Sequence, residues 1–167
     1  MDIREEDPCD GADIGNLNRR AFGGDAEGRL VDRLRVEGLT ITSLVAIVEG
    51  KLAGHILFSE VVIETGAGSV RAASLAPMAV RPELQRRGIG SALVRRGLEI
   101  CRNSGYSIAI VVGHTGYYPR FGFSPEKARP LRSPFAGPAF MALELTPGAL
   151  EGIAGTVIYP PAFSMFD

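Results

Sequence analysis

The sequence has few of the residues that build disulfide frameworks and metal sites. Among its 167 residues are two cysteines, Cys9 and Cys101, two histidines, His55 and His114, and no tryptophan. The cysteines lack CxxC spacing, so we expect one exposed and one helix-packed free thiol rather than a disulfide. The histidines lie far apart and outside any metal-type cluster. We therefore predict that no metal is bound.

The chain also shows neither a targeting segment nor a membrane span. Residues 1–7 are acidic rather than apolar, which argues against a signal peptide. No apolar run approaches the roughly 18 residues that a transmembrane helix needs. Because free thiols fit a reducing compartment, these absences predict a cytoplasmic protein with no membrane partner.

What is present is typical of one folded domain. A length of 167 residues, with 46% hydrophobic and 22% charged residues, suits a single globular domain with its own core. We expect one domain over 1–167, in which residues 146–167 form a proline-rich C-terminal extension. That extension would pack either on the sheet of its own chain or on a partner, so a homodimer is an open alternative.

The net charge of −1 hides an uneven distribution along the chain. Residues 1–64 contain 13 acidic and 7 basic residues, a balance of −6. Residues 65–135 contain 3 acidic and 11 basic residues, a balance of +8, and residues 136–167 contain 3 acidic residues and no basic one. The basic middle segment predicts that this part of the chain faces an anion.

Apolar periodicity predicts an α/β protein with a mixed sheet. The expected helices span 10–22, 25–36 and 89–104, and the expected strands span 43–48, 52–63, 70–80, 107–112, 139–145 and 155–159. The strand–helix–strand order predicts that the third and fourth of these strands run parallel. Pro77 lies inside the third strand and predicts a bulge or an edge there, because proline cannot donate to the ladder.

A glycine-bearing loop joins this third strand to the helix at 89–104. The loop runs Gln85-Arg86-Arg87-Gly88-Ile89-Gly90-Ser91. A helix N-terminus presents free N–H groups and the positive end of the helix dipole, which together favour phosphate. We therefore predict an anion site, in preference to a solvated connection whose arginines face water. The spellings GxxxxGK[ST] and GxGxxG are absent, which excludes a P-loop NTPase and a Rossmann site.

The loop resembles the Q/R-x-x-G-x-G/A pyrophosphate signature of the GNAT superfamily of acyl-CoA-dependent N-acyltransferases. Residues 78–82 (Met-Ala-Val-Arg-Pro) resemble the end of the family's fourth strand. Residues 117–123 (Tyr-Tyr-Pro-Arg-Phe-Gly-Phe) resemble its Tyr-x-x-x-Gly-Phe element. The order of elements agrees over roughly residues 1–145, and the likeness is greatest to small bacterial members of undefined substrate.

This resemblance implies a mixed, mostly antiparallel sheet whose parallel fourth and fifth strands splay apart, flanked by helices. It also implies that acetyl-CoA binds as co-substrate, with its pyrophosphate on the loop and its pantetheine arm along the fourth strand. The cofactor-binding residues implied by the match are Met78, Ala79, Val80, Gln85, Arg86, Arg87, Gly88, Ile89, Gly90 and Ser91.

The implied reaction is direct attack of an amine on the thioester. By its spacing to Gly122, Tyr118 matches the family's general acid, which protonates the departing thiolate; Tyr117 is the alternative. The base stays open among His55, Glu60, His114 and a relayed water.

We therefore expect an N-acetyltransferase that acetylates a primary amine, in a small molecule or a peptide. A non-catalytic acyl-CoA-binding or sensor domain is the alternative. The acidic flanking segments point to a cationic acceptor. No nucleic-acid partner is expected, because the arginines flank the phosphate loop instead of alternating with exposed aromatic residues.

Overall fold

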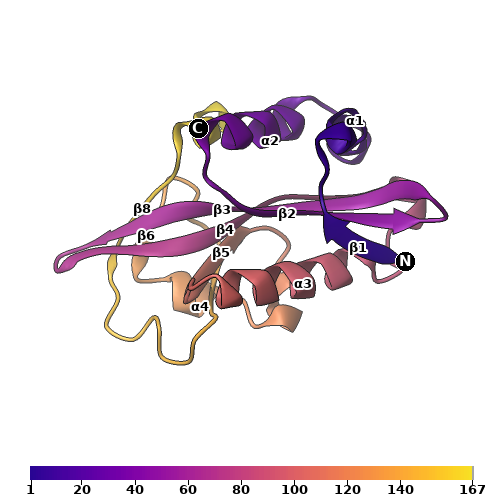
Figure 1. Ribbon diagram of the computed structural model, residues 1–167. Coiled ribbons are helices and arrows are strands. Elements are labelled where there is room, and N and C mark those ends of the chain that lie inside the picture. The colour runs from indigo at the N-terminus through magenta and orange to yellow at the C-terminus, as the bar shows by residue number, and fades with distance from the viewer. Residues whose placement is uncertain (167) are drawn as a thin grey trace.

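The computed structural model describes residues 1–166, and its central β-sheet carries helices on both faces (Figure 1). Helices α1 and α2 cover one face, and α3 and α4 cover the other. The α-helices are α1 (Gly11–Phe22), α2 (Ala26–Glu37), α3 (Ile89–Asn103) and α4 (Pro125–Ala128). The strands are β1 (Asp2–Glu5), β2 (Thr40–Val48), β3 (Lys51–Thr65), β4 (Gly68–Val80), β5 (Ile108–Val112), β6 (Leu131–Arg132), β7 (Phe140–Glu144) and β8 (Gly155–Ile158). Short 3₁₀ helices are η1 (Pro8–Asp10), η2 (Pro82–Leu84), η3 (Tyr118–Phe121) and η4 (Pro161–Phe166).

The sheet is mixed and mostly antiparallel, as predicted. Its strand order is β1-β2-β3-β4-β5-β7, and β8 pairs with both β3 and β6. The neighbours in this order are antiparallel except β4 and β5, which run parallel. Every helix and strand expected from the sequence is present within a few residues of its predicted bounds.

Strands β4 and β5 stay together for only a short distance. They pair over Ala73–Leu75 and Ala109–Val111. Beyond this point β4 continues to Val80 while still paired with β3, whereas β5 ends at Val112 and stays paired with β7. The two parallel strands therefore splay, and within residues 1–166 one edge of the last part of β4 has no strand beside it.

The predicted irregularity at Pro77 is a bulge in β4. Ile56 pairs with Met78 and Phe58 pairs with Leu75, so a single β3 residue, Leu57, faces both Ala76 and Pro77. The Ala76–Pro77 peptide bond is cis. The bulge lies at the point where β5 leaves β4, so it marks the start of the splay.

Helix α3 packs on β3 with the face that its periodicity predicts. Ile89, Leu93, Gly97 and Cys101 are buried along this face. At Gly97, a Cβ atom would overlap the ring of Phe58 on β3, so only glycine permits this approach of helix and sheet. Both cysteines are free, with Cys101 buried and Cys9 exposed, which confirms the expected pair of thiols.

The opposite face of the sheet is covered by α1, α2 and the end of the chain. Leu17 and Leu34 from the two helices form one core cluster with Val45 and Leu57 of the sheet. Ala162 and Phe163 of η4 belong to the same cluster, and β8 pairs with the end of β3. The C-terminal segment therefore packs on its own chain.

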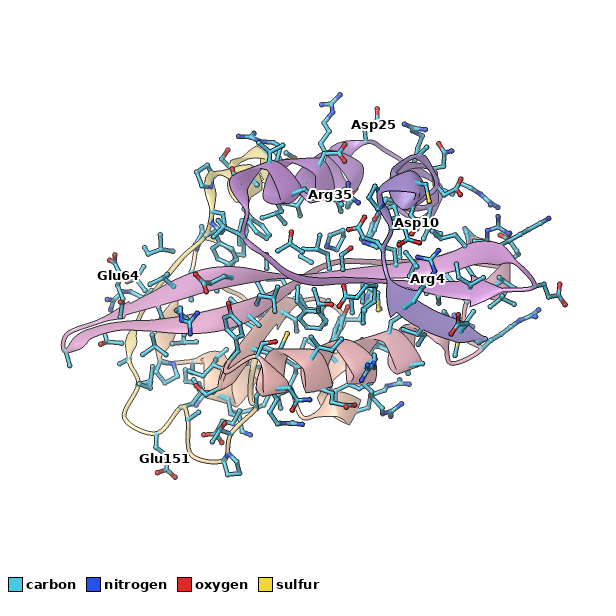
Figure 2. The ribbon with its side chains drawn as sticks, in the orientation of Figure 1. Arg4, Asp10, Asp25, Arg35, Glu64 and Glu151 are labelled. Atoms are coloured by element: carbon cyan, nitrogen blue, oxygen red, sulfur yellow. The ribbon has the colours of Figure 1, made fainter. Side chains whose placement is uncertain are left out.

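Three short elements were not predicted: β1, β6 and α4. Strand β1 is only four residues long, and Arg4 within it faces the buried Asp10 rather than an apolar layer (Figure 2). The Arg4 guanidinium donates to both carboxylate oxygens of Asp10, at 2.7 and 3.2 Å. This contact holds the pKa of Asp10 below its usual value. A strand of four residues that contains an ion-paired arginine shows no apolar alternation, which explains why β1 was not predicted.

Candidate active site

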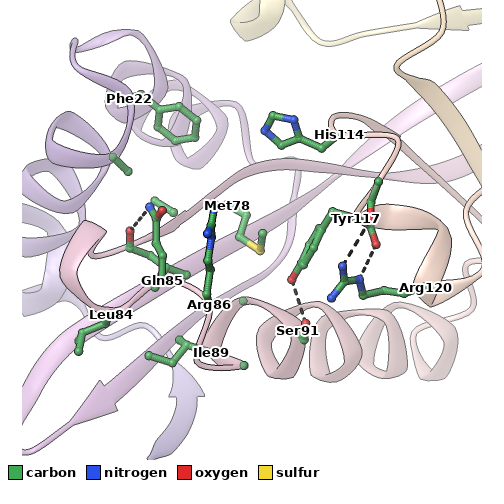
Figure 3. A pocket seen from close by; sticks show the side chains of 16 residues that line it. Phe22, Met78, Leu84, Gln85, Arg86, Ile89, Ser91, His114, Tyr117 and Arg120 are labelled. Atoms are coloured by element: carbon green, nitrogen blue, oxygen red, sulfur yellow. Dashed lines mark hydrogen bonds between the residues drawn. The ribbon is translucent and has the colours of Figure 1, made fainter.

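A cavity of about 920 Å³ opens where β4 and β5 separate (Figure 3). Its walls come from the end of α1, the end of β4, the loop into α3 and the segment after β5. Of the predicted cofactor-binding residues, all except Arg87 line it. The lining residues are Ala21, Phe22, Met78, Ala79, Val80, Leu84, Gln85, Arg86, Gly88, Ile89, Gly90, Ser91, His114, Gly116, Tyr117 and Arg120. We call this space the first cavity.

The loop into α3 turns its backbone toward the first cavity. Arg86 has φ 64° and Gly88 has φ 85°, both in the left-handed region. Gly88 is the residue before the first turn of α3, so the N–H groups of that turn have no partner within the helix. Successive N–H groups in such a turn form an anion-binding concavity, and the helix dipole adds to its attraction.

The charge of the first cavity is positive. Its lining includes two arginines, Arg86 and Arg120, and none of its lining residues in the described chain is a carboxylate. Arg120 was not predicted as a cofactor-binding residue, because it lies within the tyrosine element, outside the predicted anion-binding loop. Its guanidinium lies 4.5 Å from the ring centre of Tyr117, and its Nε donates to the Tyr117 carbonyl at 2.9 Å. Two arginines that line one cavity favour an anion there.

The free edge of β4 forms the floor of the first cavity. The N–H of Arg81 donates to the Ala53 carbonyl at 2.9 Å, so the backbone groups of the preceding Val80 point away from β3. The Gln85 side chain donates to the Val80 carbonyl at 3.1 Å (Figure 3). Gln85 thus ties the loop to the strand end. By the same alternation, the backbone N–H and C=O of Met78 face the open edge.

Gly90 and Tyr117 meet across the first cavity. The Tyr117 hydroxyl lies 3.1 Å from Oγ of Ser91, and a Cβ on Gly90 would lie 3.1 Å from the same hydroxyl. Gly90 is one of the predicted cofactor-binding residues. In the structure its bare backbone also admits the tyrosine. Tyr117 therefore packs on the first turn of α3, which joins the tyrosine element to the loop.

The predicted acid, Tyr118, lies deeper than Tyr117. Its side chain is 7% exposed and packs edge-on against Tyr117 and Phe123, with ring centres 5.1 and 5.9 Å apart. The ring covers Gly113, where a Cβ would overlap it. Desolvation by burial raises the pKa of Tyr118 to about 12. Within residues 1–166, no hydrogen bond contributes to the surroundings of its hydroxyl, whose pKa is raised by burial and by the neighbouring Tyr117.

Tyr118 lines a second cavity, of about 430 Å³, between the bulge of β4, α2 and the C-terminal segment. The name "second cavity" is used for it below. Phe22, Met78, His114 and Tyr117 line both cavities, so the two spaces adjoin. Residues that the sequence analysis did not single out line the second one: Glu27, Leu30, Phe135, Tyr159, Phe163 and Phe166. They come from distant parts of the chain and share no motif.

The three side chains considered as a base have different surroundings. His55 is fully buried, its Nε2 shares a 2.8 Å hydrogen bond with Oγ of Ser43, and desolvation lowers its pKa to about 4. Glu60 accepts a hydrogen bond from Tyr106 at 2.7 Å. Neither residue lines the first or the second cavity, whereas His114 lines both.

Residues 1–166 contain no group of three or more histidine, cysteine, aspartate or glutamate side chains placed to hold a metal ion. In that range no helix has the length and apolarity required to cross a membrane.

Two parallel strands splay apart in this fold, and a basic cavity lies where they separate, at the N-terminus of a helix. This is the architecture of an acyltransferase. Residues 2–125 match the model of the acetyltransferase (GNAT) domain family. The chain belongs to this GNAT family of N-acetyltransferases.

Two relatives match this chain over most or nearly all of its length. The protein described as uncharacterized N-acetyltransferase YhbS of Escherichia coli K12 is 35% identical over 169 residues, which cover 99% of this chain and all of YhbS. A second protein of that organism, described as uncharacterized N-acetyltransferase YjhQ, is 41% identical over 121 residues, covering 71% of this chain and 67% of YjhQ.

Two solved structures share the fold along almost the full length. YhbS from Escherichia coli, in complex with CoA, has a TM-score of 0.90 and 34% identity over 99% of this chain and 92% of that one. A GNAT family acetyltransferase from Brucella melitensis, in complex with acetyl-CoA, has a TM-score of 0.81 and 35% identity over 97% of each chain. These likenesses confirm the fold expected from the sequence.

Proposed function

We propose that the first cavity binds acetyl-CoA and that the second cavity admits the amine that receives the acetyl group. The observation that carries this proposal is the lining of the first cavity. The loop, the free strand edge and two arginines surround one space that has no carboxylate among its described lining residues. The CoA complex of YhbS and the acetyl-CoA complex of the Brucella melitensis protein support it.

The pyrophosphate suits the loop. The N–H groups of Gly88–Ser91 and the guanidinium of Arg86 supply donors and positive charge there. Arg87 is exposed and its side chain lies outside the lining, so a contribution from its backbone stays a prediction. The pantetheine arm suits the open edge of β4, where Met78 offers both backbone groups. At Val80 only the backbone N–H would be available to the pantetheine arm, because the Val80 carbonyl already accepts a hydrogen bond from the Gln85 side chain.

The thioester would lie where the two cavities adjoin. There the amine nitrogen attacks the carbonyl carbon, and the carbon–sulfur bond breaks with its electron pair on sulfur. We assign Tyr118 as the acid that gives its proton to this thiolate. Its raised pKa keeps it protonated at neutral pH, and its hydroxyl is not held by another described residue. Tyr117 is the alternative acid, but its hydroxyl already bonds Ser91.

The proton lost by the amine needs an acceptor as well. His114 is the one of the three side chains considered as a base that lines the junction of the cavities. His55 and Glu60 line neither cavity, so we propose that the general base is His114 or a relayed water.

The test measures CoA binding and turnover separately. Isothermal titration with CoA reports the first cavity, and release of free thiol from acetyl-CoA with a panel of primary amines reports transfer. We expect saturable binding and amine-dependent thiol release. Tight binding without release on any amine would favour the sensor alternative, and failure to bind CoA would overturn the proposal. The cytoplasmic location and the homodimer stay predictions; light scattering in solution tests the second.

A further inference from the structure

The second cavity has a strongly aromatic wall. Phe135, Tyr159 and Phe163 pack in a row, with ring centres 4.8 and 5.1 Å apart. Phe22, Tyr117 and Tyr118 face the same space. Rings fixed by their neighbours give a binding surface that need not be ordered when a ligand enters. This wall favours the binding of an apolar or aromatic group.

The mouth of the second cavity is apolar too. Phe22 and Val112 are each 48% exposed and Phe166 is 37% exposed, and all three line the cavity. They are half of the large hydrophobic residues found exposed within residues 1–166. Exposed apolar side chains gathered at one opening mark a binding surface rather than random exposure.

One acidic residue lines the same cavity as this aromatic wall. Glu27, in the first turn of α2, is the one acidic side chain in the described lining, and that lining contains no lysine or arginine. Within the described chain Glu27 makes no side-chain hydrogen bond or ion pair. A ligand cation would therefore find a free carboxylate, whereas a ligand carboxylate would find no cationic partner among these residues.

Several other acidic residues of the N-terminal segment are paired with arginines. Asp10 binds Arg4, Asp25 binds Arg19 at 2.7 Å, and Glu6 binds Arg35. These arginines belong to residues 1–64 and are already counted in the balance of −6, so the segment keeps its negative charge. Glu27 is the acidic residue of this segment that lines the second cavity, so we assign the attraction of a cation there to Glu27.

We propose that the acceptor is a primary ammonium carried on an aromatic or bulky apolar body and lacking a carboxylate. Glu27 attracts the cation, and the rings of Phe135, Tyr159 and Phe163 hold the body. Aromatic faces also attract a cation directly, so both parts of the wall favour the same charge. The volume of about 430 Å³ suits a small molecule. This inference rests on the proposed function, since it names the substrate class of the same site.

The experiment measures binding to the CoA-loaded protein, so it does not depend on turnover. Titration calorimetry compares 2-phenylethylamine with ethylamine, which lacks the ring, and with phenylalanine, which adds a carboxylate. We expect 2-phenylethylamine to bind roughly tenfold or more tightly than either. Thiol release from acetyl-CoA should follow the same order in kcat/KM.

Variants separate the charge from the apolar wall. Glu27→Gln should weaken 2-phenylethylamine binding roughly five- to tenfold. Glu64→Gln makes the same charge change at an exposed position near the far end of the β3–β4 hairpin, and it should leave the affinity unchanged (Figure 2). Phe166→Ala, at the exposed mouth, should weaken binding severalfold. CoA affinity should stay the same in all three variants.

The inference fails if phenylalanine or ethylamine binds as well as 2-phenylethylamine, or if Glu27→Gln binds it as the wild type does. These outcomes leave the proposed function standing, because CoA binding is measured separately. A protein that does not bind CoA would instead overturn the proposed function, and binding of the three amines to the CoA-free protein would still decide the selectivity of the second cavity.

Discussion

Tyr117 and Tyr118 are neighbours in the chain, but their hydroxyls have different surroundings. Tyr117 bonds Ser91 at the start of α3, while the more deeply buried Tyr118 has no partner among residues 1–166. Spacing to Gly122 favours Tyr118 as the acid, and its free hydroxyl supports that assignment. The segment before it is short, since Gly113–Gly116 leads directly into the one-turn helix η3.

Removing each hydroxyl tests this assignment. Tyr118→Phe should lower kcat roughly 100-fold or more, because general acid catalysis typically contributes that much. KM for acetyl-CoA should change little. Tyr117→Phe is the matched control and should lower kcat less than Tyr118→Phe. Steady-state thiol release measures both, and a larger loss in Tyr117→Phe would transfer the role of acid to Tyr117.

Adjacent arginines in the loop offer a second test at this scale. Arg86 lines the first cavity and Arg87 does not, although both were predicted from the sequence to bind the cofactor. Arg86→Gln should weaken CoA binding roughly three- to tenfold, since it removes a guanidinium beside the proposed pyrophosphate site. Arg87→Gln makes the same charge change outside the lining and should shift the affinity less than twofold. Titration calorimetry at fixed ionic strength compares them, and equal losses would contradict the proposed placement.

At the scale of elements, the site depends on how closely α3 lies on the sheet. Its N-terminal turn carries the loop, and its middle packs on β3 through Gly97. Gly54 of β3 adds to this close packing, because a Cβ there would lie 3.0 Å from side-chain atoms of Ile89 and Leu93. Two glycines therefore set the height of the helix above the strand, and with it the position of the loop.

Alanine substitutions at two helical glycines test this packing. At Gly97 the added Cβ meets the ring of Phe58, so Gly97→Ala should destabilise the fold by about 1–3 kcal/mol. At Gly15 of α1 a Cβ would meet nothing within 4 Å. Gly15→Ala should therefore stabilise by about 0.5–1 kcal/mol, as expected for a helix interior. Urea denaturation measures both changes, and a neutral or stabilising Gly97→Ala would contradict the packing account.

At the scale of the whole molecule, the buried His55 links stability to pH. It lies in β3 near the middle of the sheet, and its Nδ1 has no hydrogen-bond partner within the described residues. Desolvation lowers its pKa from 6.5 to about 4, since burial disfavours the charged ring. In the unfolded chain the ring takes up a proton near pH 6.5, whereas in the folded protein it does so only near pH 4.

Stability should therefore fall as the pH is lowered from about 6.5 to about 4, and this contribution should level off below that range. The loss attributable to His55 is roughly 3 kcal/mol at most. The free energy of unfolding from urea titrations at several pH values measures it. His55→Gln cannot titrate, so it should show a flatter dependence over this range. The same slope in both proteins would show that other groups cause the loss.

Local patterns in the sequence determined the secondary structure and the main motifs of this protein. The apolar period of residues 89–104, the loop Gln85–Ser91 and the tyrosine element each indicate their own structure, because helices, caps and turns depend mainly on neighbouring residues. The break at Pro77 follows from the missing N–H of proline. These features were enough to predict the mixed sheet and the family, and both predictions are confirmed.

Contacts between distant segments were decided only by the tertiary structure. The exclusion of Arg87 from the first cavity and the inclusion of Arg120 depend on how α3 and η3 face each other. The second cavity brings Glu27 of α2 together with Phe163 near the end of the chain. A contact of this kind leaves no periodicity or motif in the sequence, because the pattern around each residue reflects only the helix or strand in which that residue lies. The loop that we propose binds CoA could thus be found in the sequence, whereas the aromatic wall that we propose selects the acceptor forms only once the chain has folded.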